Sequence, residues 1–462
     1  MNAIIFSALG GVIMMFSSFL LKNKSWLKYI AMIVLAIVFV ANYQEIYGTI
    51  HFNIDTKGMF AFTKFGLYFN SLIIISIFLY FLVSGSQIEK VGNYPAEYFA
   101  LIFFILDGVF ILSSYNSLLT LFLGIEIMTI PLYILTGAEK NNLKGNEASL
   151  KYFLMGTFST GIMLMGIALL YGATGTFNIE AMSSLSSLGV PFYGILEPLG
   201  MIFILVAFLF KVSAAPFHFW APDVYDGAPS VFTGLMASVV KAAGFIAFIH
   251  LFQNKSVEMA DSWKILLPFF IILTLLFGNI TAVFQQSVKR MLAYSSIAQA
   301  GFMLFALYNN NFSKEGILIY TIAYTVATLG IFSILGKMKD HSYDGFNGLA
   351  KKQPFVAFAN TVFFMSLAGI PLTGGFFAKY FMLSAAISAN GIGILWLVIV
   401  ALIFAAVSVY YYFGVIKSMY FKEGEAEISD VTPAYKYALV ILVAIVFILG
   451  IYPSIITNWL YF

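Results

Sequence analysis

The strongest constraint on this chain is a series of fourteen mostly apolar stretches that follow one another with short loops between them. They lie at about residues 3–21, 26–44, 67–84, 97–115, 117–137, 149–171, 194–221, 229–251, 263–283, 290–309, 315–336, 354–386, 392–416 and 434–458. A helix of about 20 apolar residues crosses the roughly 30 Å hydrocarbon layer of a membrane. Only 10% of the 462 residues are charged, which excludes a soluble globular enzyme and a disordered chain. The sequence predicts an all-α polytopic membrane protein.

Several kinds of site have no support in the sequence. The chain has no cysteine, so disulfides, thiolate zinc sites and Cys-ligated iron–sulfur clusters are excluded. Its four histidines form no pair at i,i+4 spacing, and no glycine-rich nucleotide motif occurs. The net charge of +3 is small and spread over loops, which does not favour nucleic-acid binding. We expect no cofactor, no metal ion and no nucleic acid bound to this chain.

The distribution of basic residues predicts the orientation. Loops and helix ends on the side that follows odd-numbered spans carry sixteen Lys or Arg residues. The other side carries five: Lys57, Lys64, Lys255, Lys264 and Lys314. Because basic loops stay in the cytoplasm, the richer side is predicted to be cytoplasmic. With fourteen spans, both termini are then on the outer side of the membrane.

Sorting the basic residues leaves three lysines inside spans: Lys211, Lys241 and Lys379. Two acids, Asp107 and Glu126, are also internal. A charge at this depth costs several kcal/mol, with estimates from about 2.5 to more than 10, so it persists mainly where it is paired, hydrated or functional. Lys211, Lys241, Lys379 and Glu126 are therefore candidate functional residues, whereas Asp107 has no evident partner.

Two spans are interrupted. Pro216 follows Lys211, and Gly369 and Pro371 precede Lys379. Proline removes a helical hydrogen bond, and broken helices in the two halves of a chain indicate an inverted-repeat transporter. We expect two inverted five-helix repeats, each with a broken helix. The predicted units are residues 1–96 (three helices), 97–251 (first repeat), 263–416 (second repeat) and 434–462 (last helix).

Further candidates complete the predicted site. A buried carboxylate needs a cation, and Lys211 is the candidate partner of Glu126. His218 lies just past the first break and is a candidate proton relay. Lys151 is either part of a proton path or half of a surface i,i+4 pair with Glu147.

Polar faces of spans ten and eleven either line a water path or form interhelical hydrogen bonds; they carry Ser295, Gln299, Thr321, Thr325 and Thr328. Asp223 and Asp226 are interpreted as loop-capping residues.

The stretch KVSAAPFHFWAPDVYDGAPSVFTGLMASVVKAAGF (211–245) resembles the antiporter-like family, which comprises large membrane subunits of respiratory complex I and of cation/proton antiporters. Four more motifs support it in order: LFLGIEIMTIPLYIL, ASLKYFLMGTFSTGIML, SVKRMLAYSSIAQAGFML and LAGIPLTGGFFAKYF. The resemblance covers spans four to thirteen. It implies that Glu126 and Lys211 form the family's Glu–Lys pair, that Lys241 is its central lysine, and that Lys379 and Lys151 are further family lysines.

The resemblance also implies a function. We expect a proton-translocating subunit of a respiratory NADH:quinone oxidoreductase (complex I), in a bacterial inner membrane, with quinone reduction elsewhere in the complex. FMN and iron–sulfur clusters are expected in partner subunits, and neighbouring antiporter-like subunits and lipid are the expected contacts. Two alternatives stay open: a subunit of a multisubunit cation/proton antiporter, and a structural subunit whose buried charges only fix packing.

Overall fold

A computed structural model describes residues 1–20, 24–49, 52, 54–182, 195–253, 260–308 and 311–458, and these ranges are almost wholly helical. Lys22, His51, Lys255 and Trp459 lie outside them. The first half contains α1 (Asn2–Leu20), α2 (Leu27–Ile46), α3 (Lys64–Val91), α4 (Pro95–Leu112), α5 (Leu118–Thr136), α6 (Leu143–Thr174), α8 (Leu196–Lys211), α9 (Trp220–Gly227), α10 (Ser230–Leu235), the π-helical turn η2 (Met236–Val240) and α11 (Lys241–Gln253).

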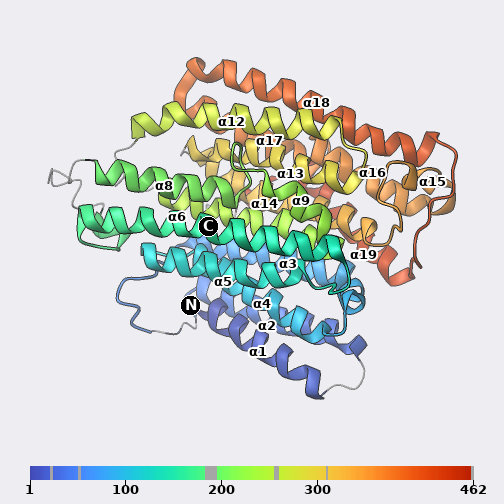
Figure 1. Cartoon of the computed structure of the whole chain (residues 1–462), viewed down its shortest axis with the longest axis horizontal. Helices are drawn as coiled ribbons and strands as arrows, with labels where there is room; N and C mark the ends of the chain where they lie inside the picture. The colour runs from blue at the N-terminus through green and yellow to red at the C-terminus, as the bar shows by residue number, and fades with distance from the viewer. Residues whose placement is uncertain are drawn as a thin grey trace.

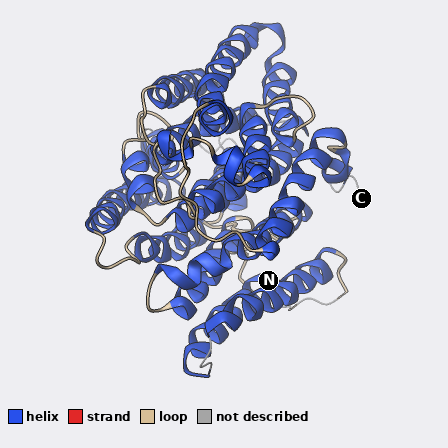
Figure 2. Cartoon of the chain, turned by 90° about the vertical axis from the view of Figure 1, so that its right-hand side faces the viewer, coloured by secondary structure: helices blue, strands red, loops and turns tan. Residues whose placement is uncertain are grey.

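The second half contains α12 (Ala260–Val283), α13 (Val288–Met303), α14 (Asn311–Leu335), α15 (Leu349–Lys352), α16 (Pro354–Ala368), α17 (Gly374–Asn390), α18 (Leu395–Phe421), α19 (Pro433–Ile451) and α20 (Ser454–Thr457). The long helices run roughly parallel, with α1 at one edge of the bundle and α12 and α18 at the opposite edge (Figure 1). A view turned by 90° looks nearly along many of these helices and shows them packed side by side (Figure 2).

Within the described ranges, 12 helices are long and apolar enough to cross a membrane, where the sequence predicts fourteen spans. The two predicted spans without such a helix are 194–221 and 354–386. They contain α8, with 16 residues, and the pair α16 and α17, with 15 and 17 residues. Both are the spans expected to be broken, so each is divided into helices that are individually too short to count.

The first break begins at Lys211. Proline clashes with the turn before it and disfavours a helical residue immediately N-terminal to it, so α8 ends before Pro216 rather than at it. Ser213 takes a left-handed conformation, with φ of 56°. Thr274 of α12 accepts a hydrogen bond from the Ala215 amide (3.0 Å), which satisfies one backbone donor that the break exposes.

The second break separates α16 from α17. Gly369 ends α16 with φ of 84°, which favours glycine, and Leu372 also has positive φ, 70°. The Gly375 amide donates to the Ser366 hydroxyl (3.2 Å) across the break. Irregular backbone at membrane depth is tolerated where protein or water satisfies it, and both breaks meet that condition.

A local arrangement in the first half recurs in the second at the same sequence spacing. Ser117 caps α5 and Ser287 caps α13. A Cβ added to Gly108 of α4 would lie 2.6 Å from the Met128 amide nitrogen, and one added to Gly278 of α12 would lie 2.5 Å from that of Ala298. In both halves, therefore, two consecutive helices approach so closely that only glycine fits at the contact.

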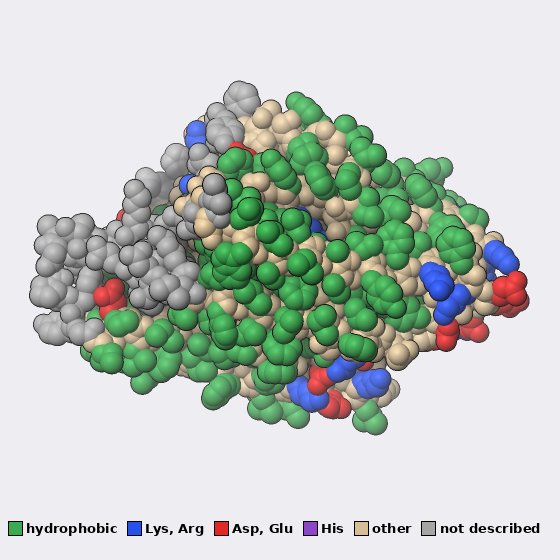
Figure 3. All heavy atoms as spheres, turned by 90° about the horizontal axis from the view of Figure 1, so that it is seen from above, with side chains coloured by type: hydrophobic (Ala, Val, Ile, Leu, Met, Phe, Trp, Pro, Cys, Tyr) green, Lys and Arg blue, Asp and Glu red, His purple; other side chains and the backbone are tan. Residues whose placement is uncertain are grey.

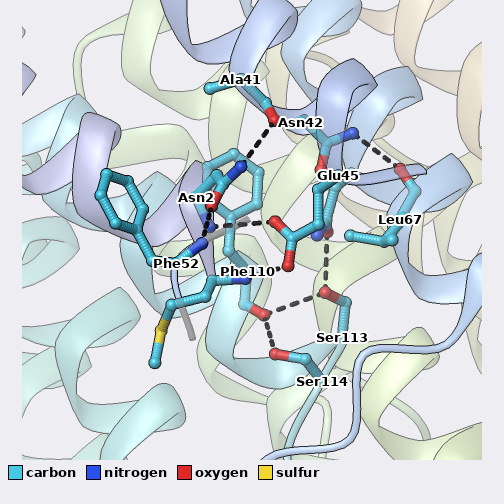
Figure 4. A network of polar contacts seen from close by, with 11 residues as sticks. Asn2, Ala41, Asn42, Glu45, Phe52, Leu67, Phe110, Ser113 and Ser114 are labelled. Atoms are coloured by element: carbon cyan, nitrogen blue, oxygen red, sulfur yellow. Dashed lines mark hydrogen bonds and ion pairs between the residues drawn. The ribbon is translucent and has the colours of Figure 1, made fainter. Parts of the chain in front are cut away.

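Polar contacts fasten the N-terminal helices together (Figure 4). The Asn2 amide donates to the Glu45 carboxylate (2.9 Å), and its side chain donates to the Ala41 carbonyl (3.3 Å). The Asn42 side chain donates to the Leu67 carbonyl of α3 (2.9 Å). The face drawn in Figure 3 is largely hydrophobic where it is described, and many of its charged side chains lie at one end and along one edge, as expected of a chain surrounded by lipid.

Candidate functional site

Lys211 is the last residue of α8, where the carbonyl end of the helix favours a positive charge. Glu126 lies on α5, one and a half turns before Pro131, and is the carboxylate whose charge acts on Lys211. The two are nevertheless not in direct contact. Lys211 Nζ and Glu126 Oε1 are both buried without a hydrogen-bond partner, and no ion pair within 4.0 Å joins them. The structure therefore does not bring Glu126 and Lys211 into a hydrogen-bonded ion pair.

Lys241 is only 2% exposed and lies directly after the π-helical turn η2. Its ammonium donates to the Ser213 hydroxyl (2.8 Å), to the Ser296 hydroxyl (2.6 Å) and to the Ser296 carbonyl (2.6 Å). These partners satisfy the three N–H groups of a protonated lysine, yet none of them is charged. Ser213 belongs to the first break, two residues after Lys211, so the contact brings the two lysines to one region.

Lys379 lies on α17 and is 8% exposed. Its ammonium donates to the Ala368 carbonyl at the C-terminus of α16 (2.8 Å) and lies 4.8 Å from the centre of the Phe302 ring. The helix end and the aromatic face both favour a cation without neutralising it. Like Lys241, this lysine is held by neutral groups.

Helix α13 connects the two lysines. Ser296, Gln299 and Phe302 are three residues apart and therefore share one face of the helix. Ser296 contacts Lys241 at one end of this face, and Phe302 contacts Lys379 at the other. Six residues of helix span about 9 Å, so the face bridges the interval between the two contacts.

Lys151 is in a different setting. Its side chain is 43% exposed and forms ion pairs with Glu147 (2.8 Å) and Asp223 (3.0 Å). Asp223 also pairs with Arg290 of α13 (3.0 Å). The predicted surface pair with Glu147 is thus present. The interpretation of Asp223 as a loop-capping residue is wrong, because it lies inside α9 and joins α6 to α13.

His218 is 3% exposed, and its ring stacks on Phe219 (4.4 Å between centroids) and Phe277 (5.4 Å). Its Nδ1 has no hydrogen-bond partner. Asp107 is buried on α4, where its carboxylate meets Ser7 of α1 and Oδ1 stays unsatisfied. Among the described residues, no hydrogen bond or ion pair joins either side chain to Lys211, Lys241 or Lys379.

A polar cavity of about 700 Å³ opens between the two halves of the bundle, and we call it the vestibule. Its charged lining residues are Lys90, Glu139, Lys144, Asp226, Lys289, Lys337, Lys339, Asp340 and His341. They come from loops and helix ends on the side predicted to be cytoplasmic. Burial, and then the charge of Lys289, lower the pKa of the His341 imidazole. Burial and the charge of Lys90 lower the pKa of the Lys337 ammonium.

Lys289 is a buried charge, although it is one of the sixteen basic residues predicted to lie in loops or at helix ends. It is 5% exposed, and its ammonium donates to the carbonyls of Asp226 (2.9 Å) and Ala228 (2.5 Å). Its position beside Arg290 at a predicted span end gave no signal of burial, because the segment that covers it comes from the end of α9.

Within the described ranges, no three His, Asp or Glu side chains are grouped to hold a metal ion.

Known proteins share this architecture and much of the sequence. A family model described as the NADH:quinone oxidoreductase/Mrp antiporter transmembrane family matches residues 115–408. NADH-quinone oxidoreductase subunit N of Cytophaga hutchinsonii is 38% identical over 98% of both chains. The same subunit of Trichlorobacter lovleyi is 39% identical over 86% of this chain and 82% of the relative. The chain belongs to the subunit N family.

Solved structures agree with this assignment. A chain of respiratory complex I from Thermus thermophilus with bound aureothin is 29% identical, with a TM-score of 0.82 over 99% of this chain and 98% of that one. A chain of an archaeal membrane-bound sulfane sulfur reductase is 25% identical, with a TM-score of 0.88. A chain of the Mrp complex from Dietzia is 17% identical and shares the fold, with a TM-score of 0.82.

The family assignment confirms the expected function class. The chain is a multi-pass, antiporter-like, proton-translocating membrane subunit of complex I. The 38–39% identity to subunit N relatives, over 86–98% of this chain, favours complex I over the cation/proton antiporter alternative.

Proposed function

We propose that protons cross this subunit along Glu126, Lys211, Lys241 and Lys379, driven by quinone reduction in other subunits of the complex. The observation that carries the proposal is the solvation of Lys241. A buried ammonium held by two serines and no carboxylate has no countercharge to retain its proton. Such a lysine can pass its proton on when a neighbouring acceptor becomes available.

The Glu126–Lys211 pair sets when the proton moves. Electrostatic attraction is strong where the surroundings are apolar, so a closer approach of Glu126 keeps Lys211 protonated. When the two groups move apart, this attraction weakens, and Lys211, then stabilised mainly by the end of α8, tends to release its proton. Ser213 lies two residues from Lys211 and contacts Lys241, which makes the first break the natural route between them.

Lys379 continues the path at the second break. From Lys241 the proton follows the α13 face through the region of Gln299, and Lys379 passes it toward one side of the membrane. Moving one charge against 100 mV costs about 2.3 kcal/mol. A change of that size is within reach of rearranging a single buried ion pair, whose disruption costs about 3–5 kcal/mol.

The vestibule is the proposed connection with the cytoplasm. Its lining comes from loops on the lysine-rich side of the chain, and Lys289 and Asp226 form part of its wall. Helix α10 runs from this wall directly to η2 and Lys241. We place both termini on the opposite, periplasmic side of a bacterial inner membrane, as the basic-residue bias predicts.

The repeated arrangement of α4 with α5 and α12 with α13 supports two five-helix repeats, at residues 97–251 and 263–416. Five is an odd number of spans, so the second repeat is inverted in the membrane relative to the first. Residues 1–96 and 434–462 flank them. Because of this inversion, the two breaks, with Lys211 and Lys379, occupy equivalent positions in the two repeats and face opposite sides of the membrane.

Lys151 and His218 have supporting roles in this proposal. Lys151, through Asp223 and Arg290, links α6 of the first repeat to α13 of the second, so a shift of one repeat reaches the helix that solvates Lys241. His218, with an unsatisfied Nδ1, is a relay near the first break. The relatives named above are subunits of complex I, so the partners here are its other membrane and peripheral subunits, including those that hold FMN and iron–sulfur clusters.

Replacing Lys211 tests the proposal. We expect Lys211→Ala, in vesicles containing the whole complex, to lose most NADH-driven proton pumping, because the first carrier is absent. Lys436→Ala, which removes an exposed lysine of α19, is the matched control and should pump normally. Normal pumping and normal quinone reductase activity in Lys211→Ala would rule out a central role for this residue.

A further inference from the structure

Gln299 is the centre of a hydrogen-bonded cluster between Lys241 and Lys379. Its Nε2 donates to the Leu367 carbonyl (3.0 Å) and to the Tyr412 hydroxyl (3.2 Å), and its Oε1 accepts from the Tyr320 hydroxyl. The Tyr412 hydroxyl also bonds the Ser295 hydroxyl. The side chain is 3% exposed, and its donors and acceptor connect four helices, α13, α14, α16 and α18.

A small cavity lies on the Lys379 side of this cluster. Its volume is about 10 Å³, close to the room that one water molecule requires. Its polar lining consists of Gln299, Tyr320, Tyr324, Ser366 and Lys379, enough partners to hold a water. Lys241 and its partner Ser296 are not part of the lining: Ser296 lies about one turn before Gln299 on α13, and Lys241 is on α11.

A row of hydroxyl groups with one amide in it reaches the Lys379 cavity from Ser295, the residue that precedes Lys241's partner Ser296 on α13. From Ser295 it runs through Tyr412, then Gln299, then Tyr320 to the cavity at Lys379. A hydroxyl both donates and accepts, so it relays a proton. A carboxamide donates only through nitrogen and accepts only through oxygen, and it does not titrate. In this arrangement Gln299 interrupts the row.

We propose that Gln299 is the gate between Lys241 and Lys379: its carboxamide blocks proton transfer while it bridges Tyr412 and Tyr320, and transfer occurs when it turns aside. This inference rests on the proposed function and adds a positioning residue to it. The contact with Leu367, two residues before the second break, couples the gate to the broken helix. A movement of α16 that withdraws the Leu367 carbonyl would release Gln299 and admit water between the two tyrosines.

Removing the amide should open the gate permanently. Gln299→Ala leaves a polar space between Tyr412 and Tyr320 that water can fill. In vesicles with the whole complex and no electron donor, an imposed pH gradient should decay about tenfold faster, the effect of lowering a barrier by about 1.4 kcal/mol. Asn279→Ala is the matched control. Asn279 is also a buried carboxamide that accepts from a tyrosine, Tyr411 (3.1 Å), but it lies on α12 outside the row.

Replacing the amide with a carboxylate gives a second readout. Gln299→Glu preserves shape but places an acid beside Lys379, where an ion pair would hold the proton on the lysine. Pumping should fall at neutral pH and recover as the pH is lowered and the new carboxyl becomes protonated. Asn279→Asp should not show this pH profile, and a purely structural Gln299 would give matching profiles for both variants.

The outcomes separate the gate from the wider proposal. A leak in Gln299→Ala but not in Asn279→Ala supports the gate. If Lys211→Ala abolishes pumping while the Gln299 variants neither leak nor change the pH profile, the gate is wrong and the lysine path stands. If lysine replacement leaves pumping intact, the path itself is wrong. Should Gln299→Ala fail to assemble, Tyr412→Phe breaks the same row, and unchanged pumping in that variant would overturn the gate.

Discussion

At the scale of single residues, charge solvation separates the lysines into two kinds. Lys241 is 2% exposed and bonded only to neutral groups, whereas Lys151 is 43% exposed and bonded to two carboxylates. A carboxylate partner holds the proton of a lysine, and neutral partners hold it less strongly. Lys241 is therefore suited to proton transfer, and Lys151 to a structural link.

The serine hydroxyls around Lys241 should affect the rate of pumping. A hydrogen bond to a charged group contributes about 1.5–3 kcal/mol, so removing one favours the neutral lysine. We expect Ser213→Ala to slow NADH-driven pumping by about tenfold, the change that 1.4 kcal/mol makes. Ser408→Ala is the control, because Ser408 is buried but bonds only the Ala405 carbonyl of its own helix (2.6 Å). Equal rates in the two variants would show that Ser213 does not tune Lys241.

Sequence alone identified Lys211, Lys241 and Lys379 because charges are rare inside apolar spans. It could not identify Lys289 as buried, since its carbonyl partners at Asp226 and Ala228 are distant in the chain. Asp223 was misassigned for the same reason, because both its cationic partners lie on other helices. The local sequence shows the type of a residue and how far inside an apolar span it lies. The residues that it contacts depend on how the helices pack.

At the scale of helices, the two breaks position the chemistry. Proline and glycine predicted both, and the structure divides those spans as expected. The π-helical turn η2 before Lys241 was not predicted. One extra residue in a turn does not disturb the apolar pattern of a buried helix, although such turns occur frequently at functional sites.

Gly369 should tolerate no side chain. Its φ is 84°, and an added Cβ would lie 2.9 Å from Cδ of Lys379. We expect Gly369→Ala to displace Lys379 from the Ala368 carbonyl, so that pumping falls and the complex melts at a lower temperature. Gly172→Ala provides the comparison, because a Cβ there would meet nothing within 4 Å. Normal pumping and melting in Gly369→Ala would show that the second break is not tightly constrained.

At the scale of the whole molecule, the residues proposed to carry protons come from both halves of the bundle. Glu126 is on α5, Lys211 ends α8 at the first break, Lys241 begins α11, and Lys379 is on α17. The order of the spans was predictable from hydrophobicity, and each of the twelve long helices overlaps one predicted span. The contacts of Lys241 and Lys379 with α13 were not predictable, because they depend on which helices of the two halves face each other.

The vestibule is also a feature of the whole molecule, because segments distant in the sequence come together to form it. Its charged lining is drawn from loops along most of the chain, from Lys90 to His341. The basic-residue bias assigned these loops to one side of the membrane, but no local pattern indicated that they surround a cavity. Its lining includes Ser230 and Val231 of α10, the helix that leads to η2 and Lys241.

The most direct test of the lysine path is the number of protons moved per NADH oxidised by the whole complex in sealed vesicles, with Lys241→Met. Methionine keeps much of the side-chain volume but cannot carry a proton. We predict a lower ratio, or loss of both activities, beside an unchanged ratio in the exposed-site control Lys436→Met. An unchanged ratio and an unchanged rate in Lys241→Met would contradict the account.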